Sequence, residues 1–308
     1  MQKYGLLIVG SGAAGLAAAL YAGRYKISTL VIGEEFGGET STAGKIENYP
    51  GAKAIEGYEL MKIMKEQAVE SGAKIQKGKV ARIERAGDLA DGWKVITETG
   101  EEYEASCVLL AIGSRRRHLN LPNEKELTGK GVHYCWTCDG PLYGGKTVAM
   151  VGGGDSSVKG VNFLAEYAKR IYFIVRGTEV RAEPVNYERM KKFGEKVEML
   201  LQTEVKEIVG SRKLEKLILS SGKDLVVDGM FVEIGFDPDT IFAQQLGLEL
   251  DERGYTKVDN MMRTNVPGVF AAGDTTSHFG SFKQDIAAAA MGAVAATAAY
   301  EYLGSLKK

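Results

Sequence analysis

The order of apolar and polar residues near the start of the chain predicts a strand, a turn, a helix and a second strand. Residues 4–10 form the apolar run YGLLIVG, residues 16–25 (LAAALYAGRY) have a helical composition, and residues 27–35 (ISTLVIGEE) form a second apolar run that ends in acids. Apolar runs without polar alternation are typical of strands that are buried on both faces. This part of the chain therefore predicts one strand–helix–strand unit of an α/β fold.

The turn between the first strand and the helix has the glycine spacing of a dinucleotide-binding motif. Gly10 permits a tight turn, Gly12 lets a pyrophosphate approach the backbone, and Gly15 lets the helix lie close to the strand. The amides at the start of the helix would face the phosphates. Glu34 or Glu35 stands where an acid bonds the ribose 2′-hydroxyl. An ordinary glycine turn is the alternative, but strand, spacing and acid together favour the dinucleotide site.

The same pattern returns in residues 145–177, GKTVAMVGGGDSSVKGVNFLAEYAKRIYFIVRG. Gly152 and Gly154 take the first two glycine positions, and Ser157 is the small residue at the third. The chain therefore contains a second strand–turn–helix–strand unit.

Cations replace the acid at the end of this second unit. Arg176 ends its second strand, and Arg181 follows five residues later. Such cations can pair with a 2′-phosphate, which favours NADP over NAD or FAD, and a solvated loop is the alternative. Two dinucleotide sites in one chain imply electron transfer between two nucleotide cofactors. The acid-ended unit suits a tightly held FAD, and the arginine-ended unit suits a nicotinamide nucleotide that exchanges.

A close pair of cysteines, Cys135 and Cys138, lies in the segment GVHYCWTCDG just before the second unit, in a chain with only three cysteines. Sulfurs at this spacing can form and break a disulfide with little backbone movement. They can also bind a metal, but structural zinc needs four ligands, and His118, His133 and His278 are scattered along the chain. A structural disulfide is a third reading, although so short a loop constrains the unfolded chain little. The motif alone leaves all three roles open.

Composition narrows the class of protein. Of 308 residues, 44% are hydrophobic and 26% are charged, which is ordinary for a soluble globular chain. The 39 Lys and Arg nearly balance the 40 Asp and Glu, so no overall field favours nucleic acid or an anionic membrane. The alanine-rich residues 286–300 predict a buried helix rather than a membrane span. We recognise no signal peptide and expect a cytoplasmic protein, in which a cysteine pair is better suited to redox cycling than to a structural role.

Four segments, taken in order, resemble the low-molecular-weight thioredoxin reductases. They are GSGAAGLAAALYAGRY with EEFGGETSTAGKIENYPG, then AIGSRRRHLNLP, YCWTCDGPLYGGKTVAMVGGGDSS and GVFAAGDTTSHFGSFKQDIAAAAMGAVAA. The resemblance runs nearly end to end, and it implies an α/β fold with two Rossmann-like, three-layer nucleotide-binding domains. It implies a discontinuous FAD domain, residues 1–117 and 246–308, with an inserted NAD(P)H domain, residues 118–245, that carries the dithiol and rotates to bring it to the flavin.

The resemblance also assigns roles to the site residues. Cys138 would make the charge-transfer contact and transient adduct with the flavin, Cys135 would attack the disulfide of the partner, and Asp139 would carry the protons. The FAD residues implied are Gly10, Gly12, Ala13, Ala14, Gly15, Glu34, Glu35, Gly38, Glu39, Asn48, Ala111, Gly113, Gly273, Asp274, Lys283, Gln284, Asp285 and Ile286. The NAD(P)H residues implied are Gly152, Gly154, Asp155, Ser156, Ser157, Arg176 and Arg181.

The implied reaction passes electrons from NADPH or NADH through FAD and the cysteine pair to thioredoxin or a glutaredoxin-like redox protein. Asn48 would lie near the isoalloxazine and Asp274 at the ribityl chain, and the helix that begins near Gln284 would direct its positive end at the flavin. A homodimer is implied by the family alone. No metal, nucleic acid or membrane partner is expected.

Four departures from the family pattern affect these expectations. Val175 and Gly177 replace a histidine and an arginine of the NADPH block, and losing one cation would weaken the preference for NADPH by about 1.5 to 3 kcal/mol if the lost hydrogen bond was charge-assisted. Lys159 stands where an acid is common, Glu39 where glutamine often faces the flavin, and Lys283 where arginine is usual. Rival hypotheses are therefore a ferredoxin-dependent or oxygen-dependent FAD dithiol oxidoreductase and, in another class, a non-catalytic flavoprotein that senses nucleotide or redox state.

Two further residues carry open questions. Trp136, between the cysteines, is expected to cover the disulfide, to meet the partner or to fill space beside the flavin. Cys107 lies in the apolar run SCVLLAI and is expected to be a buried small hydrophobe without a redox role.

Overall fold

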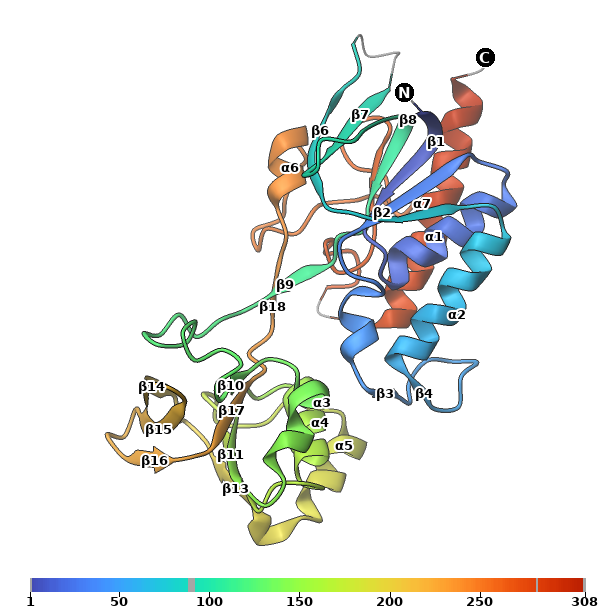
Figure 1. Cartoon of the computed structure of the whole chain (residues 1–308). Coiled ribbons are helices and arrows are strands. Elements are labelled where there is room, and N and C mark those ends of the chain that lie inside the picture. The colour runs from blue at the N-terminus through green and yellow to red at the C-terminus, as the bar shows by residue number, and fades with distance from the viewer. Residues whose placement is uncertain (1, 88–91, 281, 307–308) are drawn as a thin grey trace. The chain divides into compact units, whose positions relative to one another are not determined.

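The computed structural model forms two compact units and describes residues 2–87, 92–280 and 282–306. The first unit contains Met1–Arg115 and Asp237–Lys308, and the second contains Arg116–Phe236. Two short paired strands, β9 (Ser114–Arg116) and β18 (Phe236–Pro238), carry the chain from one unit to the other (Figure 1).

The return to the first unit lies earlier than the sequence predicts. We expected it near residue 246, but the first unit resumes at Asp237. Helix α6 (Ile241–Leu246) belongs to this unit because Phe242 and Ala243 are buried in one hydrophobic cluster with strands of its sheet. Residues predicted to close the inserted domain therefore form part of the domain that surrounds it.

The first unit is built on a seven-stranded sheet of order β5-β2-β1-β8-β7-β6, with β19 also paired to β8. The strands are β1 (Gln2–Val9), β2 (Thr29–Gly33), β5 (Lys74–Lys77), β6 (Val80–Arg85), β7 (Trp93–Thr97), β8 (Glu102–Leu110) and β19 (Val269–Ala271). Strands β5, β2, β1, β8 and β19 are parallel, and β6, β7 and β8 pair antiparallel. In β1, Leu6 and Ile8 pack in one hydrophobic cluster while Leu7 and Val9 pack in another, which explains the unbroken apolar run.

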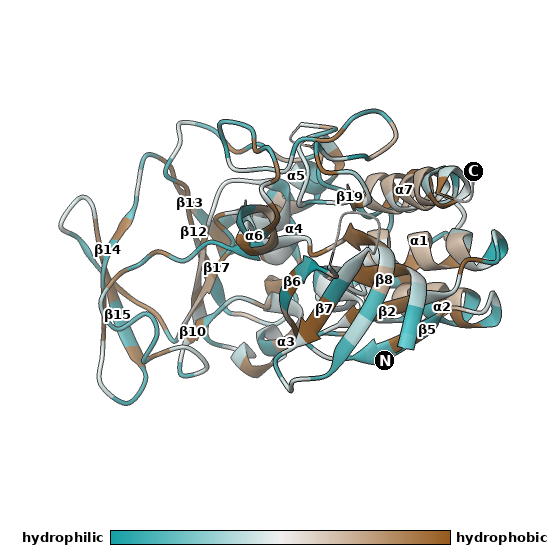
Figure 2. Ribbon diagram, turned by 90° about the horizontal axis from the view of Figure 1, so that it is seen from above, coloured by the Kyte–Doolittle hydropathy of each residue, from teal (hydrophilic) through white to brown (hydrophobic). Residues whose placement is uncertain are grey.

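Helices cover this sheet and position its glycine turn. They are α1 (Ala13–Arg24), α2 (Gly57–Glu70) and α7 (Asp285–Ser305), with the short helix η1 (Gly38–Thr42) and the strands β3 (Lys45–Ile46) and β4 (Ile55–Glu56) nearby (Figure 1). Of the helices described, α7 is the one long and apolar enough to cross a membrane, and pale to brown colours dominate it in Figure 2. However, 50% of its most apolar stretch is buried, and a Cβ at Gly292 would lie 2.0 Å from the Ala14 carbonyl oxygen. Close packing on α1 therefore accounts for its small residues.

The second unit is built on a parallel sheet of order β10-β17-β11-β12-β13. Its strands are β10 (Val132–His133), β11 (Thr147–Val151), β12 (Arg170–Ile174), β13 (Val197–Leu200) and β17 (Gly229–Val232). Its helices are α3 (Trp136–Asp139), η2 (Gly140–Tyr143), α4 (Asp155–Leu164), α5 (Pro184–Lys191) and η3 (Gly194–Lys196). A separate antiparallel sheet contains β14 (Val205–Gly210), β15 (Leu214–Leu219) and β16 (Asp224–Val226).

Strand β11 shows how this second unit forms three layers. Val148 and Met150 are buried in the cluster that contains residues of α4, and Ala149 and Val151 are buried in the cluster that contains residues of β14 and β15. The central sheet is therefore covered by helices on one face and by the antiparallel sheet on the other, as the predicted fold class requires.

Candidate functional site

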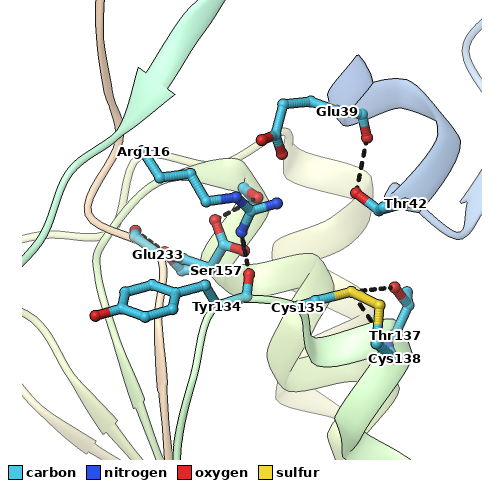
Figure 3. A network of polar contacts seen from close by, with 10 residues as sticks. Glu39, Thr42, Arg116, Tyr134, Cys135, Thr137, Cys138, Ser157 and Glu233 are labelled. Atoms are coloured by element: carbon cyan, nitrogen blue, oxygen red, sulfur yellow. Dashed lines mark hydrogen bonds and ion pairs between the residues drawn. A yellow bond between two sulfur atoms is a disulfide. The ribbon is translucent and has the colours of Figure 1, made fainter. Parts of the chain in front are cut away.

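The cysteine pair forms a disulfide at the start of α3. Strand β10 leads into Cys135, which is joined to Cys138 and caps the N-terminus of the helix. The Cys135 sulfur accepts hydrogen bonds from the Cys138 amide at 3.2 Å and from the Thr137 hydroxyl at 3.2 Å (Figure 3). Because both donors would remain after reduction, they would stabilise a thiolate on Cys135. Within the described residues, no group of three His, Cys, Asp or Glu side chains could hold a metal ion.

A buried histidine connects Asp139 to a tyrosine. His133 Nδ1 lies 2.8 Å from Asp139 Oδ2, and its Nε2 lies 2.6 Å from the Tyr143 hydroxyl. Burial, with further contributions from Asp139 and Asp228, raises the pKa of Tyr143 to about 12. Sequence reasoning considered His133 only as a metal ligand and missed Tyr143 altogether. Only the turn of α3 and η2 brings the three side chains together.

A second polar network joins the dithiol segment to the second glycine turn (Figure 3). Arg116 Nη1 donates to the Tyr134 carbonyl oxygen and, at 3.2 Å, to Glu233 Oε1. Ser156 donates to the other Glu233 carboxylate oxygen at 3.1 Å, and Ser157 donates to the Glu233 carbonyl at 3.0 Å. The Glu233 side chain is only 6% exposed, so this ion pair is shielded from water. Neither Arg116 nor Glu233 was predicted as a site residue.

Trp136 lies between the cysteines in the sequence and packs onto α4. Its ring centre lies 5.4 Å from that of Phe163, and a Cβ at Gly160 would lie 3.0 Å from its indole Cδ1. Trp136 was expected to cover the disulfide, to meet the partner or to fill space beside the flavin. Within the second unit it fills space against α4. Cys107 is buried, and burial raises its pKa to about 12, so its thiol stays protonated as expected of a core residue.

The first glycine turn is tightly packed at Gly10 and Gly15 and open at Gly12. Gly10 has a φ of 110°, and a Cβ there would lie 2.1 Å from the Ala111 carbonyl oxygen. A Cβ at Gly15 would lie 2.0 Å from the Gly10 carbonyl oxygen. At Gly12, by contrast, the nearest atom to a Cβ is the Gly37 carbonyl oxygen at 3.8 Å, and no side chain caps α1. Open space and uncapped amides at this helix start fit a pyrophosphate group.

Several predicted FAD residues meet at the start of α7. Asn48 donates to the Gln284 side-chain oxygen at 2.9 Å, and Thr40 donates to Asp285 at 2.6 Å. Gln284 precedes the helix without capping it, so the first amides of α7 have no side-chain acceptor from the cap. Ile286 follows in the first turn. This arrangement fits a cofactor group with partial negative charge.

A half-buried acid, Asp274, and a lysine, Lys283, lie in the segment before α7. Burial raises the pKa of Asp274 and lowers the pKa of Lys283. Lys283 donates to the carbonyl oxygens of Asp274, at 3.3 Å, and Thr276, and its ammonium lies 4.2 Å from the centre of the Tyr255 ring. The cation therefore takes backbone and aromatic partners, as the arginine usual here could.

The other predicted FAD residues are spread along the same unit. Ala13 and Ala14 lie in the first turn of α1, where Gly273, with φ of 81°, approaches Ala14 so that a Cβ would lie 3.0 Å from the Ala14 Cβ. A Cβ at Gly38 would lie 3.7 Å from the Gly12 Cα, and Gly113 has open space around it. Glu39 accepts a hydrogen bond from Thr42 on its carbonyl at 3.0 Å (Figure 3).

The two acids at the end of β2 differ in their contacts. Glu34 lies 3.5 Å from the Lys79 ammonium, whose pKa is raised by Glu98 and by Glu34. Glu35 accepts a hydrogen bond from Ser11 on its carbonyl at 2.9 Å, and both acids are exposed. Both are therefore accessible to a ribose.

A cavity of about 550 Å³ is lined by Arg181, whose backbone contacts the second glycine turn. Gly152 has a φ of 144°, and Gly154 begins α4 with nothing within 4 Å of a Cβ. The Arg181 amide donates to Gly153 at 2.8 Å, which places this arginine beside the turn. The cavity is lined by Arg176, Gly177, Thr178, Glu179, Arg181, Gln202, Glu204, Lys206 and Ser220. Sequence reasoning found the two arginines but missed Lys206, which lies on β14 of the separate antiparallel sheet, and Ser220, which directly follows β15 of the same sheet.

Asp155 and Lys159 form an ion pair on α4 rather than acting alone. Lys159 lies 2.8 Å from Asp155, which also accepts hydrogen bonds from Asn186 at 3.0 Å and from the Glu183 amide at 2.9 Å. Although burial works to raise it, these hydrogen bonds lower the pKa of Asp155. Val175, another departure, is only 2% exposed and packs against Gly153, so of the two replaced positions only Gly177 faces the cavity.

Fold and site together define a class of enzyme. Two Rossmann-like units, each with a glycine turn at the start of a helix, and a cysteine pair beside one of them are the parts of a disulfide oxidoreductase with two nucleotide sites. The chain belongs to the pyridine nucleotide-disulphide oxidoreductase family, whose sequence model matches residues 4–296. Membership of this family implies a flavin and a pyridine nucleotide.

Known relatives narrow the class further. The chain is 38% identical over 306 residues to the thioredoxin reductase of Mycolicibacterium smegmatis, an alignment that covers 97% of this chain and 96% of the relative. The crystal structure of T. acidophilum thioredoxin reductase is 36% identical, with a TM-score of 0.90 and coverage of 98% and 99%. That of a ferredoxin-flavin thioredoxin reductase from Clostridium acetobutylicum is 36% identical, with a TM-score of 0.53 and coverage of 99% of both chains. These similarities confirm the predicted fold class and the resemblance to thioredoxin reductases.

Proposed function

We propose that this chain reduces the disulfide of a thioredoxin-like protein with electrons that a nicotinamide nucleotide supplies through FAD and the cysteine pair. The observation that carries the proposal is the Cys135 sulfur at the start of α3, where the Cys138 amide and the Thr137 hydroxyl donate to it. These donors favour the thiolate, which is the form that attacks a disulfide. The relatives named thioredoxin reductase support the choice of partner.

The first unit would hold FAD. The open, uncapped start of α1 at Gly12 would take the pyrophosphate, and Glu34 or Glu35 the adenosine ribose. Asn48 and Gln284, joined at the start of α7, would lie near the ring system. When bound, FAD accepts two electrons from the nicotinamide nucleotide and passes them to the disulfide.

The cysteine pair would act by thiol–disulfide exchange. The Cys135 thiolate bonds to one sulfur of the partner disulfide, and the other partner sulfur leaves with the electron pair. The Cys138 thiol gives its proton to Asp139, and its sulfur attacks Cys135 and displaces the second partner thiolate. Asp139 then returns the proton to a partner thiolate. Two electrons thus pass to the partner and the Cys135–Cys138 disulfide forms again.

The cavity beside the second glycine turn would hold the adenosine end of NADPH or NADH. Arg176 and Arg181 line it together with Lys206, which supplies a cation that the sequence pattern did not reveal. Lys206 lies 2.6 Å from Glu204 and lowers the pKa of that exposed carboxyl. A 2′-phosphate would therefore compete with Glu204 for Lys206.

A ferredoxin-type donor is a second candidate. It is favoured by the similarity to the Clostridium acetobutylicum ferredoxin-flavin thioredoxin reductase and by Gly177, which leaves one cation fewer at the cavity than the family pattern has. Anaerobic titration separates the two donors. We expect NADPH or NADH to bleach the flavin absorbance, and failure of both would replace the nicotinamide donor with the ferredoxin-type donor.

The dithiol mechanism is tested with Cys138→Ser and the control Cys107→Ser. Cys138→Ser should lower the reduction of a thioredoxin disulfide by a factor of about 10³ or more, because a mixed disulfide can form but cannot be resolved. Its flavin content should equal that of the unaltered protein. Cys107→Ser should keep the activity, since the buried Cys107 takes no part. Equal turnover in Cys138→Ser and the unaltered protein would reject the mechanism.

We further propose a cytoplasmic homodimer as the working form. The reaction suits a compartment in which thiols are kept reduced. Light scattering of the purified protein measures its mass, and a value near the 33.3 kDa of one chain would contradict the dimer.

A further inference from the structure

His133 is a buried polar residue that the proposed reaction leaves without a task. Its side chain is 5% exposed, while that of Asp139 is 35% exposed. Its ring stacks on Phe231 with ring centres 5.3 Å apart and planes inclined by 27°. Asp139 and Tyr143 bond its two nitrogens. The ring is thus fixed in place by packing and by both hydrogen bonds.

The carboxylate of Asp139 sets the direction of these hydrogen bonds, because an ionised carboxylate can only accept. Tyr143 keeps its proton, since its pKa is about 12, and can donate to His133 Nε2. The ring proton of a neutral histidine then lies on Nδ1, which donates to Asp139 at 2.8 Å. Two other charged groups act on the tyrosine: Asp228 contributes to its raised pKa, and the Lys146 ammonium lies 5.0 Å from its ring centre. The chain therefore runs from Tyr143 through His133 to the carboxylate beside the dithiol.

We propose that His133 is the positioning residue that orients Asp139 for proton transfer during thiol–disulfide exchange. This inference rests on the proposed function and adds one element to it. When Asp139 receives the proton of Cys138, its hydrogen-bonded oxygen remains an acceptor for His133 Nδ1–H, so the other oxygen presents the proton toward the sulfurs. No electron passes through His133, and the proton count of the exchange is unchanged.

The test compares two substitutions that separate packing from hydrogen bonding. His133→Phe keeps an aromatic ring against Phe231 but removes both hydrogen bonds, and His133→Asn keeps an N–H near the position of Nδ1. We expect turnover with a thioredoxin disulfide to fall about 10-fold in His133→Phe and about 3-fold in His133→Asn, with KM for the disulfide protein within about twofold, as acid–base assistance rather than binding is weakened. The acid limb of the pH–turnover profile should also shift in His133→Phe.

A matched control and a double variant make the result specific. His118 also bonds a tyrosine hydroxyl, that of Tyr134 at 2.9 Å, and lies 3.8 Å from Glu124, but it is exposed. His118→Asn should keep its turnover within about twofold, as expected for an exposed pair. Because His133 acts through Asp139, the variant with His133→Phe and Asp139→Asn should be no slower than Asp139→Asn alone. Multiplied losses in the double variant, or unchanged turnover and pH profile in His133→Phe, would overturn the inference.

A direct measurement on the thiols separates this inference from the proposed function. The reduced holoenzyme is alkylated with iodoacetamide over a range of pH, which requires no partner protein. His133→Phe should shift the pH midpoint of alkylation by about one unit relative to the unaltered protein, since Asp139 lies next to Cys138 in the sequence. If the unaltered protein reduces no thioredoxin disulfide, the proposed function fails, and the alkylation profile alone decides on His133. If His133→Phe does not fold, His133→Asn and Tyr143→Phe take its place. The alkylation midpoints of these two variants should both shift from that of the unaltered protein, and in the same direction as each other.

Discussion

The two glycine turns of the molecule have the same local pattern but are closed by different contacts. In the first unit, Gly15 lies so close to the Gly10 carbonyl that a Cβ would approach it to 2.0 Å. In the second unit the equivalent residue is Ser157, which donates to the Glu233 carbonyl at 3.0 Å. One turn is closed by direct contact of backbone atoms, and the other is closed through a side chain.

Hydrogen bonds also link the second turn to the segment that carries the cysteine pair, whereas the helix that follows the first turn packs against α7. Glu233 links Ser156 to Arg116, and Arg116 bonds the carbonyl of Tyr134 next to the dithiol. In the first unit, α7 packs against α1 at Gly292. Backbone closure under a long helix suits a cofactor that stays bound, and a polar turn at an open cavity suits a nucleotide that exchanges. Three predictions would break or sharpen this comparison.

The largest effect is expected at the cavity of the second unit. Arg176→Ala should raise KM for NADPH about 10-fold or more and leave KM for NADH within about twofold, since only NADPH carries the 2′-phosphate and a charge-assisted hydrogen bond contributes about 1.5 to 3 kcal/mol. Initial rates with both nucleotides measure the ratio. The control Arg212→Ala removes an exposed arginine of the same unit that does not line the cavity. Equal changes in KM for NADPH and for NADH would show that Arg176 does not bind the 2′-phosphate.

The next largest effect is expected when alanine replaces the third residue of the motif in each glycine turn. Gly15→Ala should destabilise the first unit by about 1 to 3 kcal/mol because the added Cβ overlaps the Gly10 carbonyl. Bound flavin should fall with it. Ser157→Ala adds no atom and removes one hydrogen bond, so about 1 kcal/mol is expected in the second unit. Urea unfolding and flavin absorbance measure both, and a smaller loss in Gly15→Ala than in Ser157→Ala would refute the contrast.

Sequence patterns revealed the parts of the site that are local. Glycine spacing, the strands around it and the cysteine pair all lie within short segments, and the structure places each where the pattern predicts. His133 was considered only as a metal ligand, and Tyr143, Glu233 and Lys206 were missed, because their neighbours depend on how turns and distant segments pack. For example, Ser156 and Glu233 are 77 positions apart. The predicted domain boundary near residue 246 differs from the boundary at Asp237 for the same reason. Only the packing of α6 shows that this helix belongs to the first unit.

The smallest effect concerns the acid at the start of α4, which has no counterpart in the first turn of α1. Lys159→Met removes an ion pair at 2.8 Å and should destabilise the protein by about 0.3 to 0.5 kcal/mol at pH 7, as expected for residues four positions apart on a helix. Because the folded protein lowers the pKa of Asp155 below 3.8, the stabilisation by its carboxylate is present above that pH and is lost as the pH falls through the lowered value. The difference between variant and unaltered protein should therefore vanish in acid. Urea midpoints measured from pH 7 down to pH 2 test this, with Lys62→Met, whose ammonium lies 3.8 Å from Glu59 on α2 of the first unit, as the matched exposed pair. If Lys159→Met is equally destabilised across this pH range, Lys159 stabilises the protein through packing. The acid in the first turn of α4, which α1 lacks, then contributes nothing to stability through this ion pair.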